Sequence, residues 1–196
     1  MTRSIGIYVY DDVAVLDVTG PYEVFTCATR VSAMAAPDAP PFRVRTIGRT
    51  SALLRARAGL TVFPEADFGG AGIDVLIVPG GVIDAELARP DVMAWIAGVA
   101  RDCELVAAIG TGAFLLTQAG LLDGRQVAAQ QPPAGAAAAF PELRIEGKRR
   151  LAGQGAIVAA GGVTAGIDLS LHLVERLAGR ELALATARHM DYDWTE

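Results

Sequence analysis

The chain has 196 residues and a net charge of −5, and 52% of its residues are hydrophobic. This composition excludes an intrinsically disordered chain, and the length suffices for one α/β domain, residues 1–196, with a sizeable core. The negative charge and the lack of a Lys/Arg stripe argue against nucleic acid as a partner. No stretch is apolar enough for a membrane span or a signal peptide. We therefore expect a cytoplasmic protein without a membrane partner, in line with its two cysteines.

β-Rich stretches alternate with helical patterns along the chain, which is typical of an α/β fold with a mostly parallel sheet and helices on both faces. The expected strands are Ile5–Tyr10, Phe42–Ile47, Leu53–Arg57 and Leu60–Phe63 as a hairpin, Asp74–Val78, Leu105–Ile109, Gln126–Ala129, Leu143–Ile145, Arg150–Ala152 and Gly155–Ala160. Helices are expected from Asp17 onward and over Pro90–Arg101, Ala113–Leu122, Pro132–Phe140, Thr164–Leu177 and about Arg180 to His189, with a loop over Val31–Pro41.

Two of the most apolar strands lead directly into glycine turns. Asp74–Val78 is followed by Pro79–Gly81, and Leu105–Ile109 is followed by Gly110–Gly112. Ligands of open α/β sheets bind at the carboxyl ends of the strands, where the N–H groups of such turns can form an oxyanion hole. The alternative is that the glycines only allow close helix packing. The backbone candidates for binding negative charge are Gly80, Gly81, Gly110 and Gly112.

Asp17 follows the first strand and begins the first helix, so its carboxyl group can face the same edge. The simpler role is a helix cap, which the sequence alone favours. The alternative is a general acid or base whose pKa is raised by an apolar pocket. The two histidines, His172 and His189, lie in C-terminal helices, and Cys27 and Cys103 fit small buried residues. We therefore expect neither a histidine dyad, nor a metal site, nor a cofactor.

Four stretches closely resemble the PfpI/ThiJ superfamily, and together the resemblance covers nearly the whole chain. They are LDVTGPYEVF (Leu16–Phe25), DVLIVPGG (Asp74–Gly81), GTGAFLLTQAGLLDGR (Gly110–Arg125) and GGVTAGIDLSLHLVERLAG (Gly161–Gly179). The nearest branch resembles isonitrile hydratase and the ligand-binding domains of certain AraC-type regulators. This resemblance implies a flavodoxin-like sandwich of the class I glutamine amidotransferase group, a homodimer, and a small-molecule substrate or ligand.

The chain departs from the superfamily pattern at the turn where that pattern carries its nucleophilic cysteine. Gly110 stands at this position, whereas Asp17 and Thr111 match an Asp and a Thr of the isonitrile hydratase pattern. Where relatives commonly carry Thr-Thr-His-Trp, this chain has Ala-Ala-Gln-Gln over residues 128–131, so Gln130 becomes a candidate substrate-binding residue. Because glycine has no thiol, the resemblance implies a site without covalent thiol catalysis.

Three functions fit these features. The first is an enzyme that uses Asp17 as the proton-transfer group and Thr111 with the turn amides to hold negative charge. Its reaction would be a hydration, elimination, isomerisation or cyclisation of a small molecule, with secondary metabolism as a possible context. The second is a small-molecule sensor without catalysis. The lack of a helix-turn-helix stretch in these 196 residues argues against transcription control by the chain itself. The third is a disabled mutant or a degenerate paralogue with only a structural role. The first is favoured by a small margin, because Asp17, Thr111 and both glycine turns are present together.

Overall fold

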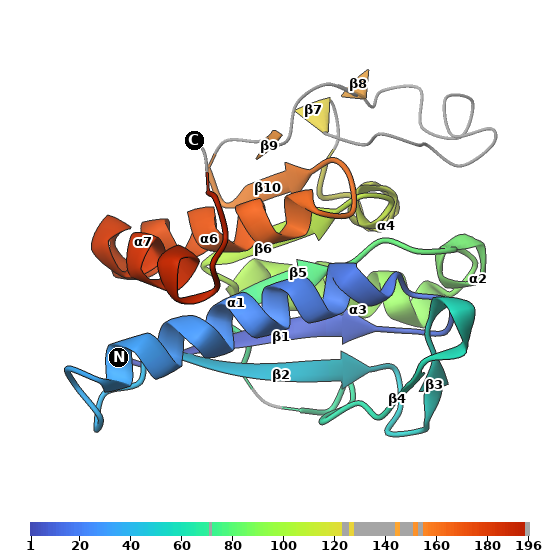
Figure 1. Ribbon diagram of the computed structural model, residues 1–196. Coiled ribbons are helices and arrows are strands. Elements are labelled where there is room, and N and C mark those ends of the chain that lie inside the picture. Colours follow the sequence, from blue (N-terminus) through green and yellow to red (C-terminus); the bar gives the residue numbers. More distant parts are fainter. Residues whose placement is uncertain (71, 123–125, 128–143, 146–150, 153–154, 195–196) are drawn as a thin grey trace.

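A six-stranded sheet forms the centre of the computed structural model, which describes residues 1–70, 72–122, 126–127, 144–145, 151–152 and 155–194. The strand order is β2–β1–β5–β6–β10–β9 (Figure 1). The first five of these strands run parallel, and only β9 pairs antiparallel with its neighbour. Their bounds are β2 Phe42–Gly48, β1 Arg3–Val9, β5 Val75–Val78, β6 Leu105–Ile109, β10 Ile157–Ala160 and β9 Leu151–Ala152. The expected flavodoxin-like α/β class is confirmed.

The helices form two layers around this sheet (Figure 1). One layer contains α1 (Val15–Ala33), α6 (Ala165–Ala178) and α7 (Arg180–His189), which pack against one another. The other contains α2 (Asp84–Leu87), α3 (Pro90–Asp102) and α4 (Gly112–Gln118). Right-handed crossovers explain this division, because the chain moves outward in opposite directions from β1 and from β5. The strand order therefore reverses between β1 and β5, and such a switch point is where ligands of open α/β sheets bind.

The core lies between the sheet and both helix layers. Every residue of β5 and β6 is buried, as expected for parallel strands covered on both faces. α1 packs closely on α6 because Gly20 carries no side chain, and a Cβ there would lie 3.3 Å from Ile167. This dense packing holds the strand ends and the first turns of the helices in fixed positions.

Three local expectations differ from the structure. α1 continues to Ala33 into the expected loop, because the first proline that could stop it is Pro37. α4 ends at Gln118 rather than Leu122, since Gly120 takes a left-handed conformation with φ +76°. The single-turn helix α2 was not expected. The expected helix over Pro132–Phe140 lies outside the described residues.

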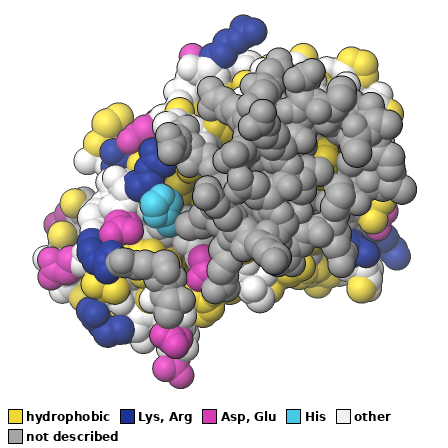
Figure 2. All heavy atoms as spheres, turned by 90° about the horizontal axis from the view of Figure 1, so that it is seen from above, with side chains coloured by type: hydrophobic (Ala, Val, Ile, Leu, Met, Phe, Trp, Pro, Cys, Tyr) yellow, Lys and Arg dark blue, Asp and Glu magenta, His cyan; other side chains and the backbone are white. Residues whose placement is uncertain are grey.

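Short strands complete the described part of the chain. The expected hairpin is confirmed as β3 (Leu54–Arg55) paired antiparallel with β4 (Thr61–Val62), joined by the short helical turn Arg57–Gly59. β7 (Gln126–Val127) pairs in parallel with β8 (Arg144–Ile145) as a separate two-stranded sheet. Among the described residues, no helix is both long and apolar enough to cross a membrane. On the face in Figure 2, positive and negative side chains lie interspersed where residues are coloured by type.

Candidate active site

A cavity of about 210 Å³ lies at the carboxyl edge of the sheet, where the segments after β1, β5, β6 and β10 meet. Five of the residues predicted from the sequence line it, and the loop after β10 completes its wall. The lining residues are Ala14, Asp17, Arg57, Gly80, Gly81, Gly110, Thr111, Gly162 and Val163. Gly112 lies next in the chain at the start of α4, and Gln130 lies outside the described residues.

Gly110 forms a sharp turn between β6 and α4. Its backbone is left-handed, with φ +53°, a conformation that costs most other residues about 1–2 kcal/mol. A Cβ at this position would lie 3.5 Å from Oδ2 of Asp17, so a side chain here would stand in the cavity beside the carboxyl group. The turn therefore has the geometry that presents a side chain to a ligand, but it carries no side chain.

The carboxyl group of Asp17 lies in the first turn of α1 and is only 3% exposed. The N-cap of this helix is Ala14, and no side chain caps it, so the capping role favoured by the sequence is wrong. Instead, Oδ2 of Asp17 accepts a hydrogen bond from the amide of Gly80 at 3.1 Å, across the switch point. Oδ1 is buried and has no hydrogen-bond partner among the residues that the structure describes. Burial raises the pKa of Asp17 to about 6, although the hydrogen bond from Gly80 acts in the opposite direction.

The hydroxyl of Thr111 joins the two glycine turns. It accepts a hydrogen bond from the amide of Gly81 at 2.9 Å and donates one to the carbonyl oxygen of the same residue at 3.0 Å. The amides of Gly80 and Gly81 are therefore both occupied by side chains of the site. The turns approach so closely that a Cβ at Gly112 would overlap the carbonyl oxygen of Val78. Glycine is required at 112 for this packing, which is the alternative that the sequence left open.

Sequence reasoning missed Arg57, which also lines the cavity. This residue lies in the turn of the β3–β4 hairpin, and its amide donates to the carbonyl of Val13 at 3.0 Å. The amide of Asp12 donates to the carbonyl of Arg55 at 2.7 Å, so the hairpin is held beside the segment that enters α1. No sequence signal marks this placement, because α1 and β2 lie between the two bonded segments in the chain.

The histidines and cysteines lie apart from the cavity. The imidazole of His172 is 3.9 Å from the carboxylate of Glu175 on the same helix, and burial lowers the pKa of this histidine. The thiol of Cys103 donates to the carbonyl of Ile73 at 3.2 Å, and burial raises its pKa to about 12. Cys27 is buried within α1. Within the described ranges, no three metal-ligating side chains form a cluster.

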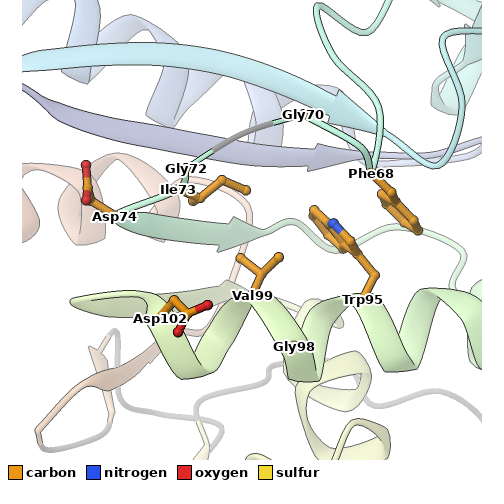
Figure 3. A pocket seen from close by; sticks show the side chains of 9 residues that line it. All are labelled: Phe68, Gly70, Gly72, Ile73, Asp74, Trp95, Gly98, Val99 and Asp102. Atoms are coloured by element: carbon orange, nitrogen blue, oxygen red, sulfur yellow. The ribbon is translucent and has the colours of Figure 1, made fainter.

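A second cavity, of about 450 Å³, lies between α3 and the segment leading into β5 (Figure 3). The rings of Phe68 and Trp95 stack at one end, with centroids 4.1 Å apart. Asp74 and Asp102 lie at the other end (Figure 3). The carboxylate of Asp74 already accepts the amide of Ser4 at 2.7 Å. This cavity is larger, but the residues predicted from the sequence line the smaller one.

Comparison with known proteins places these observations in a family. The model of the DJ-1/PfpI family matches residues 3–176. Isonitrile hydratase of Pseudomonas putida is 28% identical over 199 residues, which cover 98% of this chain and 79% of that protein. The HTH-type transcriptional regulator GbdR of Pseudomonas aeruginosa is 28% identical over 97% of this chain, and the chain spans 51% of its length. A THiJ/PfpI family protein from Pseudomonas syringae has the same fold, with a TM-score of 0.83, 23% identity, and coverage of 100% of this chain and 77% of that one.

The regulators among these relatives correct one expectation. Nucleic acid was excluded as a partner because the chain is negatively charged, but several similar proteins are HTH-type transcriptional regulators. The net charge is that of this chain alone, which spans 51% of the length of GbdR. The expectation that nucleic acid is excluded as a partner is therefore wrong.

Proposed function

This chain belongs to the DJ-1/PfpI family, and we propose that it performs non-covalent acid–base chemistry on a small organic molecule. Asp17 is the proton-transfer group in this proposal. The observation that supports it is the buried carboxyl group at the cavity, in which Oδ2 accepts a hydrogen bond from the amide of Gly80 and Oδ1 has no partner within the described part of the chain. A buried polar atom without a partner is costly, and such atoms are found where a ligand supplies the missing bond.

We infer that Gly110 stands where the family pattern has its cysteine. Glycine offers no nucleophile, so no covalent intermediate can form through residue 110. The volume that a side chain would fill is left to the ligand, and it lies 3.5 Å from the carboxyl oxygen of Asp17. A ligand atom in this volume is within reach of proton transfer to or from Asp17.

The pKa of Asp17, raised to about 6, suits proton transfer in both directions near neutral pH. At pH 7 the carboxyl group of Asp17 is ionised in most molecules and can accept a proton. In a minority of molecules it is protonated and can donate one. Hydration, elimination, isomerisation and cyclisation all need such a step, together with stabilisation of the charge that develops. Thr111 lies beside the same cavity, and its hydroxyl assists when it exchanges the hydrogen bond that it donates to the carbonyl of Gly81 for one to the ligand. The isonitrile hydratase relative makes hydration the first reaction class to test.

A second candidate function is small-molecule binding without catalysis. The match to GbdR over 97% of this chain favours it, because that protein is a transcriptional regulator rather than an enzyme by name. The same cavity would then hold a ligand, and the buried carboxyl group of Asp17 would contribute to recognition.

The two functions are separated by the variant Asp17→Asn, which keeps the shape of the side chain but cannot transfer a proton. Wild type and variant are incubated with a library of small organic molecules that includes isonitriles, and conversion is followed by mass spectrometry. We expect turnover to fall at least about a hundredfold in the variant, while ligand binding measured by NMR persists. Asp84→Asn, an exposed carboxyl on α2, is the matched control and keeps full turnover. Equal turnover in Asp17→Asn would reject Asp17 as the proton-transfer group, and binding without conversion by the wild type would favour the sensor.

A further inference from the structure

The candidate cavity carries one cationic side chain among the described residues that line it, Arg57. Two backbone hydrogen bonds hold the hairpin in place beside the segment that enters α1. The amide of Arg57 donates to the carbonyl of Val13, and the carbonyl of Arg55 accepts from the amide of Asp12. Ala56, between these two arginines, is buried with 2% exposure and anchors the hairpin. The hairpin therefore holds Arg57 at the cavity, while its side chain remains exposed.

The two charged groups of the cavity differ in burial and therefore in depth. Asp17 is 3% exposed and lies against the backbone of the turn after β5, whereas Arg57 is exposed at the mouth. Within the part of the chain that the structure describes, the guanidinium of Arg57 forms no hydrogen bond or ion pair with another side chain. All the other lining residues have neutral side chains or are glycines. A ligand in the cavity thus meets a positive charge at the mouth and an acid at the base.

We propose that Arg57 selects a carboxylate-bearing substrate or ligand, binding its carboxylate at the mouth of the cavity while the rest of the molecule reaches Asp17 and the open space at Gly110. The planar guanidinium pairs with a carboxylate through two parallel hydrogen bonds. The chain as a whole has a charge of −5, so an anion gains no general attraction and depends on this local cation. The inference rests on the proposed function only in taking this cavity as the functional site, and it holds for either an enzyme or a sensor.

Three probes of one shape and different charge test this assignment: benzoate, benzamide and benzamidine, which are negative, neutral and positive at pH 7.5. Dissociation constants are measured by ligand-observed NMR at low and high salt. For the wild type we expect benzoate to bind most tightly, with an advantage over benzamide that shrinks as salt screens the charge. In Arg57→Gln we expect benzoate affinity to fall about fivefold or more, with benzamide little changed and benzamidine strengthened, because Asp17 is then the remaining charge.

Arg55→Gln is the matched control, since Arg55 is an exposed arginine of the same hairpin that does not line the cavity. We expect it to keep the wild-type order of the three probes. Equal binding of benzoate and benzamide to the wild type, no benzoate binding at all, or the same loss in both arginine variants would overturn the inference. Asp17→Asn separates it from the proposed chemistry, because this variant is expected to lose turnover yet keep the preference for benzoate over benzamide.

Discussion

The buried carboxyl group of Asp17 makes the stability of the fold depend on pH in an unusual direction. Burial raises the pKa of this acid from 3.8 to about 6, so the folded chain binds the proton more tightly than the unfolded chain. Well below pH 3.8 both states are protonated and Asp17 contributes nothing to the pH dependence. As pH rises toward 6, the unfolded state releases the proton first, and the free energy of unfolding falls. Above the folded pKa the loss is complete and constant.

The size of this loss follows from the two pKa values. At about 1.36 kcal/mol for each pKa unit, a rise from 3.8 to about 6 corresponds to about 3 kcal/mol. The amide of Asp17→Asn does not ionise, so this variant avoids the loss while its carbonyl oxygen can still accept the amide of Gly80. Part of this loss already occurs below pH 4, so we expect the stability of the variant relative to wild type to rise by about 2.4 kcal/mol between pH 4 and pH 7.

Urea unfolding of wild type and Asp17→Asn at half-unit steps from pH 4 to 7.5 measures this difference directly. The difference in free energy of unfolding between the two proteins, rather than either pH curve alone, separates the contribution of Asp17 from that of the other carboxyl groups. Asp84→Asn reports what removal of an exposed carboxyl group does. Parallel curves for wild type and Asp17→Asn would refute the reasoning, as would a wild type that gains stability over the variant with rising pH.

Two further predictions concern the glycine turns. Gly110→Cys should place a thiol in the cavity that iodoacetamide alkylates at neutral pH at least about tenfold faster than the native thiols, because burial raises the pKa of both Cys27 and Cys103. Peptide mass mapping locates the label. Equal labelling of all three cysteines would contradict an accessible side-chain position at this turn. Gly112→Ala should lower the free energy of unfolding by about 2 kcal/mol or more, because the new methyl group overlaps a carbonyl oxygen of β5. Its control is Gly98→Ala in α3, where a Cβ meets no atom within 4 Å and helix propensity should add up to about 1 kcal/mol; equal effects of the two substitutions would argue against the close contact.

Much of the sheet could be predicted because its strands follow simple rules. β5 and β6 are continuous apolar runs that end in glycine turns, and such runs indicate parallel strands covered on both faces. The carboxyl ends of these strands necessarily share one edge, so the convergence of Gly80, Gly110 and Thr111 followed from the fold class. The capping role of Asp17 was wrong because helix position is a local signal. Its carboxyl oxygen bonds instead to Gly80, 63 residues along the chain, and such a partner depends on strand order.

Arg57 could not be predicted for a related reason. Nothing in the residues around it distinguishes it from Arg55, two positions away, which is also exposed. The difference arises from two backbone hydrogen bonds to the segment between β1 and α1, which set the hairpin so that Arg57 lines the cavity. Backbone contacts of this kind do not depend on side-chain identity and leave no pattern in the sequence.

The backbone conformation at Gly110 favours glycine over a residue with a side chain. At φ +53° most residues with a side chain cost about 1–2 kcal/mol more than glycine. Strain of this kind persists where the side chain contributes to function. A chain that has no use for a nucleophile at 110 is stabilised by glycine there, and it gains free volume beside the carboxyl group. The ionisable side chains among the described residues of the cavity are then an acid at its base and a cation at its mouth. Under the proposed function, a ligand that pairs with both places a proton-exchanging group near Asp17 and a negative charge near Arg57.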